Sequence, residues 1–213
     1  MKTAISLTLL AVAATLLPGS WLELQRGGAA WRIATCHFTH FTYEQLVWDA
    51  LVFLLLAIAC ARRNRGAFRA TLLASVVVVP IAVLAFSNVT TYRGLSGIDS
   101  ALFGRLLVTE WRRSRVIAVC GVAFAAKMVF EMSTGATVFV HSDAFVAVPA
   151  AHIAGALVGV IVAISQRLFS SSIAQVSRGC SGSVRSIFSH GMRCGCALWE
   201  RLPRYRRRPM PTW

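Results

Sequence analysis

The sequence predicts an all-α membrane protein in which six transmembrane helices form one domain and the fourth helix is short and buried. Of the 213 residues, 56% are hydrophobic and only 14% are charged, and the mean hydropathy is +0.64. This composition is typical of integral membrane proteins and argues against a soluble domain. Apolar runs recur over residues 1–168, which are therefore expected to form the membrane domain.

The six apolar runs are separated by polar or basic segments. They cover Thr3–Leu17, Leu46–Ala61, Ala70–Phe86, Leu95–Val108, Val116–Met132 and Phe145–Ile164. The first run follows Lys2, as in a signal peptide, but the stretch LLPGSW offers a poor cleavage site. We therefore expect the first helix to be retained.

The basic residues predict the orientation of the spans. Arginines cluster at 62–69, at 105–115 and from 167 onwards, whereas the alternate loops contain few. Because Lys and Arg are enriched on the cytoplasmic side of membranes, both termini are expected in the cytoplasm. The same distribution argues against nucleic-acid binding despite a net charge of +14. The basic tail, residues 169–213, is expected to lie in the cytoplasm and contact anionic lipid.

The fourth run is too short to cross a bilayer from the outer surface. Leu95–Val108 would extend about 21 Å as a helix, against a hydrocarbon core of roughly 30 Å. Arg105 and the cluster at 112–115 are expected to hold its cytoplasmic end, so its outer end should lie below the surface. The preceding segment, SNVTTYRG, should then dip into the membrane, which requires a protein or water-filled surrounding.

Ser96 lies at the start of this short helix, in the stretch TYRGLSGIDS. The first turn of a helix presents unpaired backbone N–H groups and a partial positive charge. Such groups are suitable donors to an oxyanion. Gly94 and Gly97 permit a tight turn and a close backbone approach. We therefore interpret Ser96 as a candidate nucleophile.

His152 is the candidate base for this serine. It lies about 10 Å along the sixth span, and the fourth helix should start roughly 9 Å below the outer face, so the two side chains are expected at one level. Small residues, which let membrane helices approach closely, repeat every four positions in both spans: Ala151, Gly155, Gly159 and Ala163 in the sixth, and Ser96, Ser100 and Gly104 in the fourth.

A purely structural interpretation of the two residues is also open. Ser96 could cap the helix, and His152 could hydrogen-bond a neighbour within the core. The pattern Gly-Leu-Ser-Gly is short, and it is not the Gly-x-Ser-x-Gly elbow of other hydrolases because Ile98 occupies the last position.

Taken together, three segments resemble the rhomboid family of intramembrane serine proteases. GLSG (94–97) resembles the nucleophile motif, and AHIAGALVG (151–159) resembles the histidine motif of the sixth helix. WRIATCHFTHFTYEQLVWDALVF (31–53) resembles the first loop and second helix. The resemblance covers about residues 30–165 and implies a six-helix rhomboid-like bundle.

Finer features are similar to the rhombosortase branch of this family. They are LVWDALVF, YRGLSG and KMVFEMSTG, in which Lys127 and Glu131 are expected to pair across one helical turn. The resemblance implies a protein of the bacterial inner membrane. It also implies transmembrane protein substrates, in this branch proteins with a C-terminal Gly-Gly sorting helix.

The chain departs from the family at two positions that help to hold the oxyanion. Gln45 stands where many rhomboids have histidine, and Asp49 stands where they have asparagine. Gln45 retains an N–H donor, whereas Asp49 could donate only if protonated. With the backbone at Leu95, these residues are the expected oxyanion and substrate-binding set, although Asp49 could instead anchor a neighbouring helix. His40 matches a first-loop histidine that is structural in the family.

The expected activity is that of a serine endopeptidase with a Ser96–His152 dyad and no metal or cofactor. Two other classes are open: a non-catalytic rhomboid-like protein that binds or retains membrane clients, and a small transporter. A transporter would be expected to show an internal repeat, and the sequence shows none. The sequence does not specify an oligomeric state.

Overall fold

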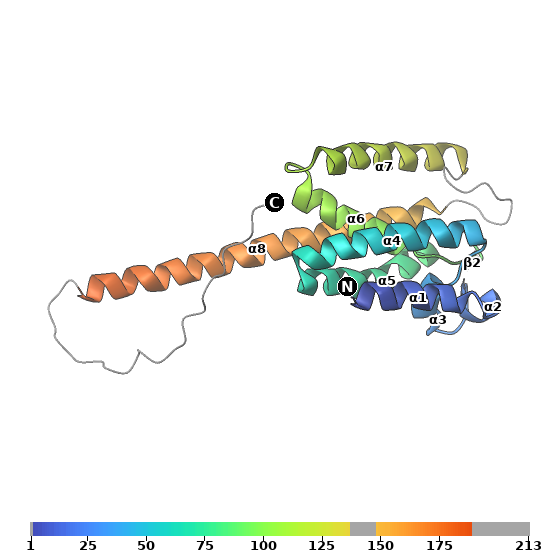
Figure 1. Ribbon diagram of the computed structural model, residues 1–213, viewed down its shortest axis with the longest axis horizontal. Helices are drawn as coiled ribbons and strands as arrows, with labels where there is room; N and C mark the ends of the chain where they lie inside the picture. The colour runs from blue at the N-terminus through green and yellow to red at the C-terminus, as the bar shows by residue number, and fades with distance from the viewer. Residues whose placement is uncertain (1, 137–147, 189–213) are drawn as a thin grey trace. The chain divides into compact units, whose positions relative to one another are not determined.

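The structure is a computed structural model that describes residues 2–136 and 148–188. In chain order its elements are α1 (Lys2–Ala14), α2 (Gly19–Leu22), β1 (Leu24–Gln25), α3 (Arg32–Thr35), the 3-10 helix η1 (Cys36–Phe38), α4 (Tyr43–Arg63), α5 (Arg65–Phe86), β2 (Thr91–Tyr92), α6 (Ser96–Glu110), α7 (Arg115–Thr134) and α8 (Pro149–Phe188) (Figure 1). The contacts divide the chain into two units, Met1–Phe169 and Ser170–Trp213. The candidate site lies in the first unit.

Four of the described helices are long and apolar enough to cross a membrane. They are α4, α5, α7 and the segment Pro149–Ser172 of α8, and a shorter apolar helix covers Thr3–Ala14. The chain is therefore a mostly helical, multi-pass membrane protein. A helix occupies each of the six expected runs, but a count of six spans stays a prediction because the helices at the first and fourth runs are short. The segment 133–144, between the fifth and sixth expected runs, lies largely outside the described residues.

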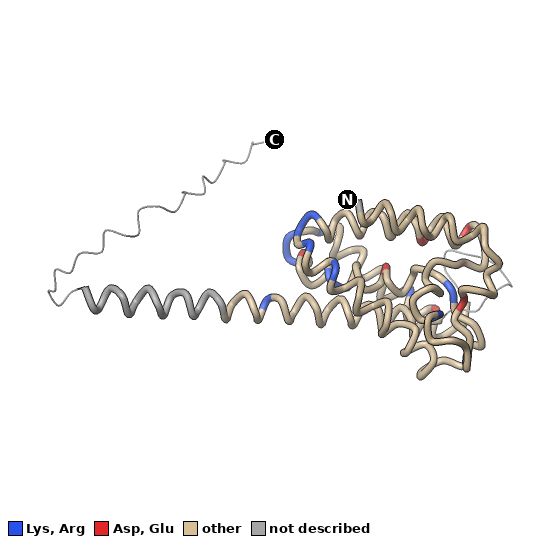
Figure 2. Tube along the Cα trace, turned by 90° about the horizontal axis from the view of Figure 1, so that it is seen from below, with Lys and Arg blue, Asp and Glu red and all other residues tan. Residues whose placement is uncertain are grey.

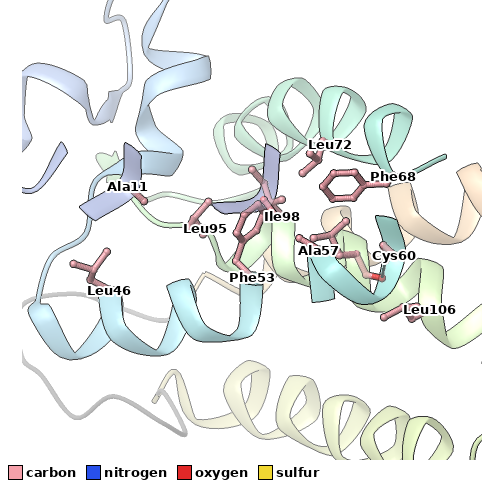
Figure 3. Packing of buried hydrophobic residues seen from close by; sticks show 12 residues of the cluster. Ala11, Leu46, Phe53, Ala57, Cys60, Phe68, Leu72, Leu95, Ile98 and Leu106 are labelled. Carbon is pink, nitrogen blue, oxygen red and sulfur yellow. Dashed lines mark hydrogen bonds between the residues drawn. The ribbon is translucent and has the colours of Figure 1, made fainter. Parts of the chain in front are cut away.

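The short helix α6 is the centre of the bundle. It has 15 residues, or about 22 Å at 1.5 Å per residue, and it packs against both α4 and α5. Figure 3 shows the core that these helices form, with Phe53 of α4, Phe68 of α5 and Ile98 of α6 turned toward one another. The short, buried character expected of the fourth helix is therefore observed.

Arg105 does not mark the polar end of α6, contrary to the expectation. The helix continues to Glu110, and the Arg105 side chain is only 2% exposed. The polar end is formed one turn later, where Arg63 Nε lies 2.8 Å from Glu110 Oε1. The prediction was wrong because it placed Arg105 at the end of the helix, whereas this residue lies within the helix.

The turns between α4 and α5 and between α6 and α7 lie at one end of the bundle. Lys and Arg residues gather at this end (Figure 2). The clusters at 62–69 and 112–115 belong to these two turns. The expectation that this end faces the cytoplasm rests on that charge distribution and stays a prediction.

Helices α6 and α8 meet backbone to backbone. A Cβ built on Gly155 would collide with the carbonyl of Gly97, and one built on Gly159 would collide with the carbonyl of Ala101. A Cβ on Gly97 would lie 3.3 Å from the carbonyl oxygen of Ala151. The close approach of the two helices therefore depends on glycine at these positions.

The contact face of α6 agrees with the expected one only in part. Ala151, Gly155 and Gly159 of α8 make contact as expected, and Gly104 of α6 meets the backbone of Ala156, but Gly97 and Ala101 take the place of Ser96 and Ser100. The hydroxyl of Ser100 donates instead to the carbonyl of Ser96 within the helix, at 2.8 Å. Ser96 therefore borders the contact rather than filling it.

Replacing Gly155 with Ala should destabilise the bundle by about 1–3 kcal/mol, because the added methyl overpacks the contact with Gly97. The matched control is Gly66→Ala in the first turn of α5, where a Cβ meets only Asn64 Oδ1 at 3.4 Å. Losing a helical glycine there should raise stability by up to about 1 kcal/mol. Equilibrium unfolding in mixed micelles measures both, and equal effects would contradict this packing.

Candidate active site

Ser96 and His152 lie at the same level of the bundle. Ser96 precedes Gly97 and His152 follows Ala151, and Gly97 and Ala151 are in contact across the α6–α8 interface. Both candidate side chains are half-buried. The expected meeting of a serine and a histidine from two helices is therefore compatible with the packing.

No hydrogen bond joins the Ser96 and His152 side chains, both of which lie in the described part of the chain. Catalytic hydrogen bonds are often long before substrate binds and shorten in the complex. Ser96 and His152 thus lie at the same level along the helix axes, but their side chains are not hydrogen-bonded to each other. Their catalytic roles stay a prediction.

The N-terminus of α6 is left without a side-chain cap. The helices α4, α5 and α7 begin at Thr42, Asn64 and Ser114, each of which accepts a hydrogen bond from a backbone N–H of the first turn. The residue before α6 is Leu95, which has no such side-chain bond. Backbone donors at the start of α6 therefore remain available to an oxyanion.

The turn that leads into α6 is held at three successive residues. Gly94 has a φ of 118°, and its N–H donates to the Cys36 carbonyl at 3.0 Å. The Arg93 carbonyl accepts from Gln45 Nε2 at 3.5 Å, and the Leu95 N–H donates to Asp49 Oδ2 at 3.2 Å. Because these bonds come from different segments, the path of the chain into Ser96 is strongly constrained.

Gln45 and Asp49 face this turn from one side of α4. A Cβ on Gly94 would lie 2.7 Å from Gln45 Nε2 and 3.1 Å from Asp49 Oδ2. Gln45 also accepts a hydrogen bond from the Phe41 N–H at 2.9 Å. Both residues lie beside the turn before Ser96, where each already bonds the backbone of the chain, and their expected role at the oxyanion stays a prediction.

Leu95 takes part in the site through its backbone. Its side chain is 1% exposed and belongs to the core formed by α4, α5 and α6 (Figure 3). Burial of this side chain fixes the residue that directly precedes the candidate nucleophile. Whether Leu95 also contacts a substrate stays a prediction.

Further contacts, which were not predicted from the sequence, hold the turn before α6. Leu24 and Tyr92 pair in the antiparallel β1–β2 ladder, and Arg93 forms an ion pair with Glu23. The Arg93 guanidinium also stacks 4.8 Å above the Phe41 ring. Glu23 is an acid between α2 and β1 of an apolar chain, which is the signal that could have indicated a charged partner.

The first-loop residues Cys36 and His37 are structural. Both side chains are fully buried, and His37 Nε2 lies 3.1 Å from the Val76 carbonyl. Burial lowers the pKa of His37 to about 4 and raises the pKa of Cys36 to about 12. Both therefore stay neutral at pH 7 and contribute packing rather than charge.

The expected ion pair in α7 is confirmed, with Lys127 Nζ 2.6 Å from Glu131 Oε1. Among the described residues, no group of three or more His, Cys, Asp or Glu side chains could hold a metal ion. A cavity of about 220 Å³ lies beside His40 and Arg93, between the end of α1 and the start of α4. Ser96 and His152 do not line it.

Comparison with known proteins identifies a family. Residues 27–167 match the rhomboid domain, a range that includes every candidate site residue. No curated protein matches the chain at a significant level.

Replacing Gly94 with Ala should destabilise the protein by more than the same change at Gly27. Both residues have positive φ values, which cost a non-glycine residue about 1–2 kcal/mol. At Gly94 the added Cβ also meets Gln45 Nε2, whereas nothing lies within 4 Å at Gly27. Thermal unfolding in detergent should show a clearly lower midpoint for Gly94→Ala, and equal midpoints would mean that the turn is not tightly packed.

Proposed function

Because the chain belongs to the rhomboid family, whose members are usually intramembrane serine proteases, we propose that it is an intramembrane serine endopeptidase. The observation that supports this most strongly is that Ser96 and His152 lie at the same level on either side of the α6–α8 contact. The uncapped N-terminus of α6 adds backbone donors beside the hydroxyl. Together these supply a nucleophile, a base and an oxyanion site.

In the proposed mechanism, His152 takes the proton of Ser96 as its oxygen attacks a peptide carbonyl. The tetrahedral oxyanion is held by N–H groups at the start of α6, with Gln45 as a further donor. The C–N bond then breaks, and His152 gives its proton to the leaving amine. A water molecule, deprotonated by His152, attacks the acyl-enzyme ester and releases the carboxylate product and free Ser96.

We propose that the substrates are transmembrane segments of other proteins, cleaved near their outer ends. Ser96 begins α6, whereas the arginine-rich turn to α7 follows the other end of this helix, which supports an outer position of the site if those turns face the cytoplasm. The similarity to the rhombosortase branch favours substrates with a C-terminal Gly-Gly sorting helix in a bacterial inner membrane. That similarity rests on LVWDALVF, YRGLSG and KMVFEMSTG.

A non-catalytic rhomboid-like protein that retains membrane clients is the second candidate. Two observations favour it: the absence of a hydrogen bond between the described Ser96 and His152 side chains, and an acid at position 49. A carboxylate facing a developing oxyanion would oppose catalysis. The two candidates differ in whether Ser96 reacts covalently.

A fluorophosphonate probe should label the detergent-solubilised wild-type protein and fail to label Ser96→Ala, because only an activated hydroxyl attacks phosphorus. His152→Gln should lower the labelling rate by roughly 10²–10⁴-fold, the usual contribution of a general base. Ser133→Ala is the matched control, since Ser133 is exposed near the end of α7 and bonds only the Phe130 carbonyl. Folded wild-type protein that takes up no label would support the non-catalytic candidate.

Coexpression with a reporter that ends in a Gly-Gly sorting helix tests the substrate. Wild-type protein should release the reporter as a shortened product, and Ser96→Ala should leave it intact. A reporter with Gly-Gly replaced by Leu-Leu should be cleaved much less. If both reporters are cleaved equally, the enzyme is a general intramembrane protease, and if both copurify uncleaved with the wild type, the protein retains clients.

A further inference from the structure

We propose that Asp49 is a positioning residue, whose carboxylate together with His40 holds the Leu95 N–H and so orients the start of α6. In this role Asp49 accepts hydrogen bonds and does not donate one to the oxyanion. The inference rests on the proposed protease function. It assigns a specific task to the acid that stands where the family usually has asparagine.

The geometry around Asp49 Oδ2 is that of an acceptor. This oxygen lies 3.2 Å from the Leu95 backbone nitrogen and 3.4 Å from His40 Nε2. The backbone N–H can only donate, so the oxygen facing it must accept. A carboxylate oxygen suits this position beside the Leu95 N–H and the His40 ring, because an ionised carboxyl group only accepts hydrogen bonds.

His40 is well placed to support this carboxylate. Its side chain is 1% exposed, against 13% for Asp49, and both ring nitrogens are buried without a hydrogen-bond partner. A buried polar group without a partner is costly, and the Asp49 carboxylate, 3.4 Å from Nε2, can offset part of that cost through charge. His40 also lines the cavity of about 220 Å³.

Other charged or titratable groups near the pair come from the turn and from α6. Arg93 is already paired with Glu23. Tyr92 and Asp99 lie within electrostatic range of Asp49, and both are buried. None of these groups replaces His40 as the partner of Oδ2.

Holding the Leu95 N–H matters because Leu95 directly precedes the nucleophile. The Leu95 carbonyl accepts from the Asp99 N–H at 2.9 Å, which is the first hydrogen bond of α6. Fixing both polar groups of Leu95 therefore fixes the direction of the helix and of Ser96. A misplacement of about 1 Å at a reacting group can reduce a rate by roughly 10²-fold. With Asp49 engaged in this way, the oxyanion donors are the backbone of α6 and Gln45.

The substitutions Asp49→Asn and Asp49→Leu test whether position 49 must supply a hydrogen-bond acceptor or only fill a volume. Asparagine keeps an oxygen that can accept from Leu95, and activity should stay within about tenfold of wild type. Leucine keeps the volume but removes the acceptor, and kcat should fall by roughly 10²-fold. Glu44→Gln is the control, because it neutralises an exposed carboxylate in the first turn of α4 away from the turn at Leu95.

A spectroscopic test does not depend on activity. In full-length protein labelled with ¹⁵N-leucine in micelles, the Leu95 amide resonance, identified by its loss in Leu95→Met, should move in Asp49→Leu and in His40→Gln but not in Glu44→Gln. A Leu95 resonance unaffected by Asp49→Leu would overturn the proposal. If the resonance moves as expected while Ser96 takes up no fluorophosphonate, the positioning contact stands and the protease function fails.

Discussion

The candidate site depends on the close approach of α6 and α8. Gly155 and Gly159 allow backbone contact with Gly97 and Ala101, and no larger side chain fits at that separation. This contact sets Ser96 and His152 at one level although more than fifty residues separate them in the chain. Without this contact, the Ser96 hydroxyl on α6 and the His152 imidazole on α8 would not be held at the same level.

A second constraint acts on the turn before α6. Three successive backbone positions are bonded to η1 and α4, and the β1–β2 pairing with the Glu23–Arg93 ion pair braces the same segment from the first loop. The first loop therefore contributes to the site without supplying a candidate catalytic group. Buried polar groups in an apolar bundle are expensive, and two of them, Glu23 and Gln45, are used to hold this turn through Arg93.

Much of this arrangement could be predicted from local pattern. The short fourth helix and the Lys127–Glu131 pair follow from hydropathy and four-residue spacing. The rotation of α6 that places Gly97 in the contact, and the burial of Arg105, could not be predicted, because they depend on how neighbouring helices pack. The Asp49–His40 pair joins a helix to a loop, and spacing along the chain carries no signal for such a contact.

The central claim is that Ser96 and His152 act on one substrate carbonyl. An experimental structure of the protein inactivated by a peptide phosphonate tests it most directly. The account predicts phosphorus bonded to the Ser96 oxygen, a ring nitrogen of His152 within about 3 Å of the leaving-group position, and a phosphoryl oxygen facing the first N–H groups of α6. An adduct on another residue, or a His152 ring turned away from the modified serine, would contradict it.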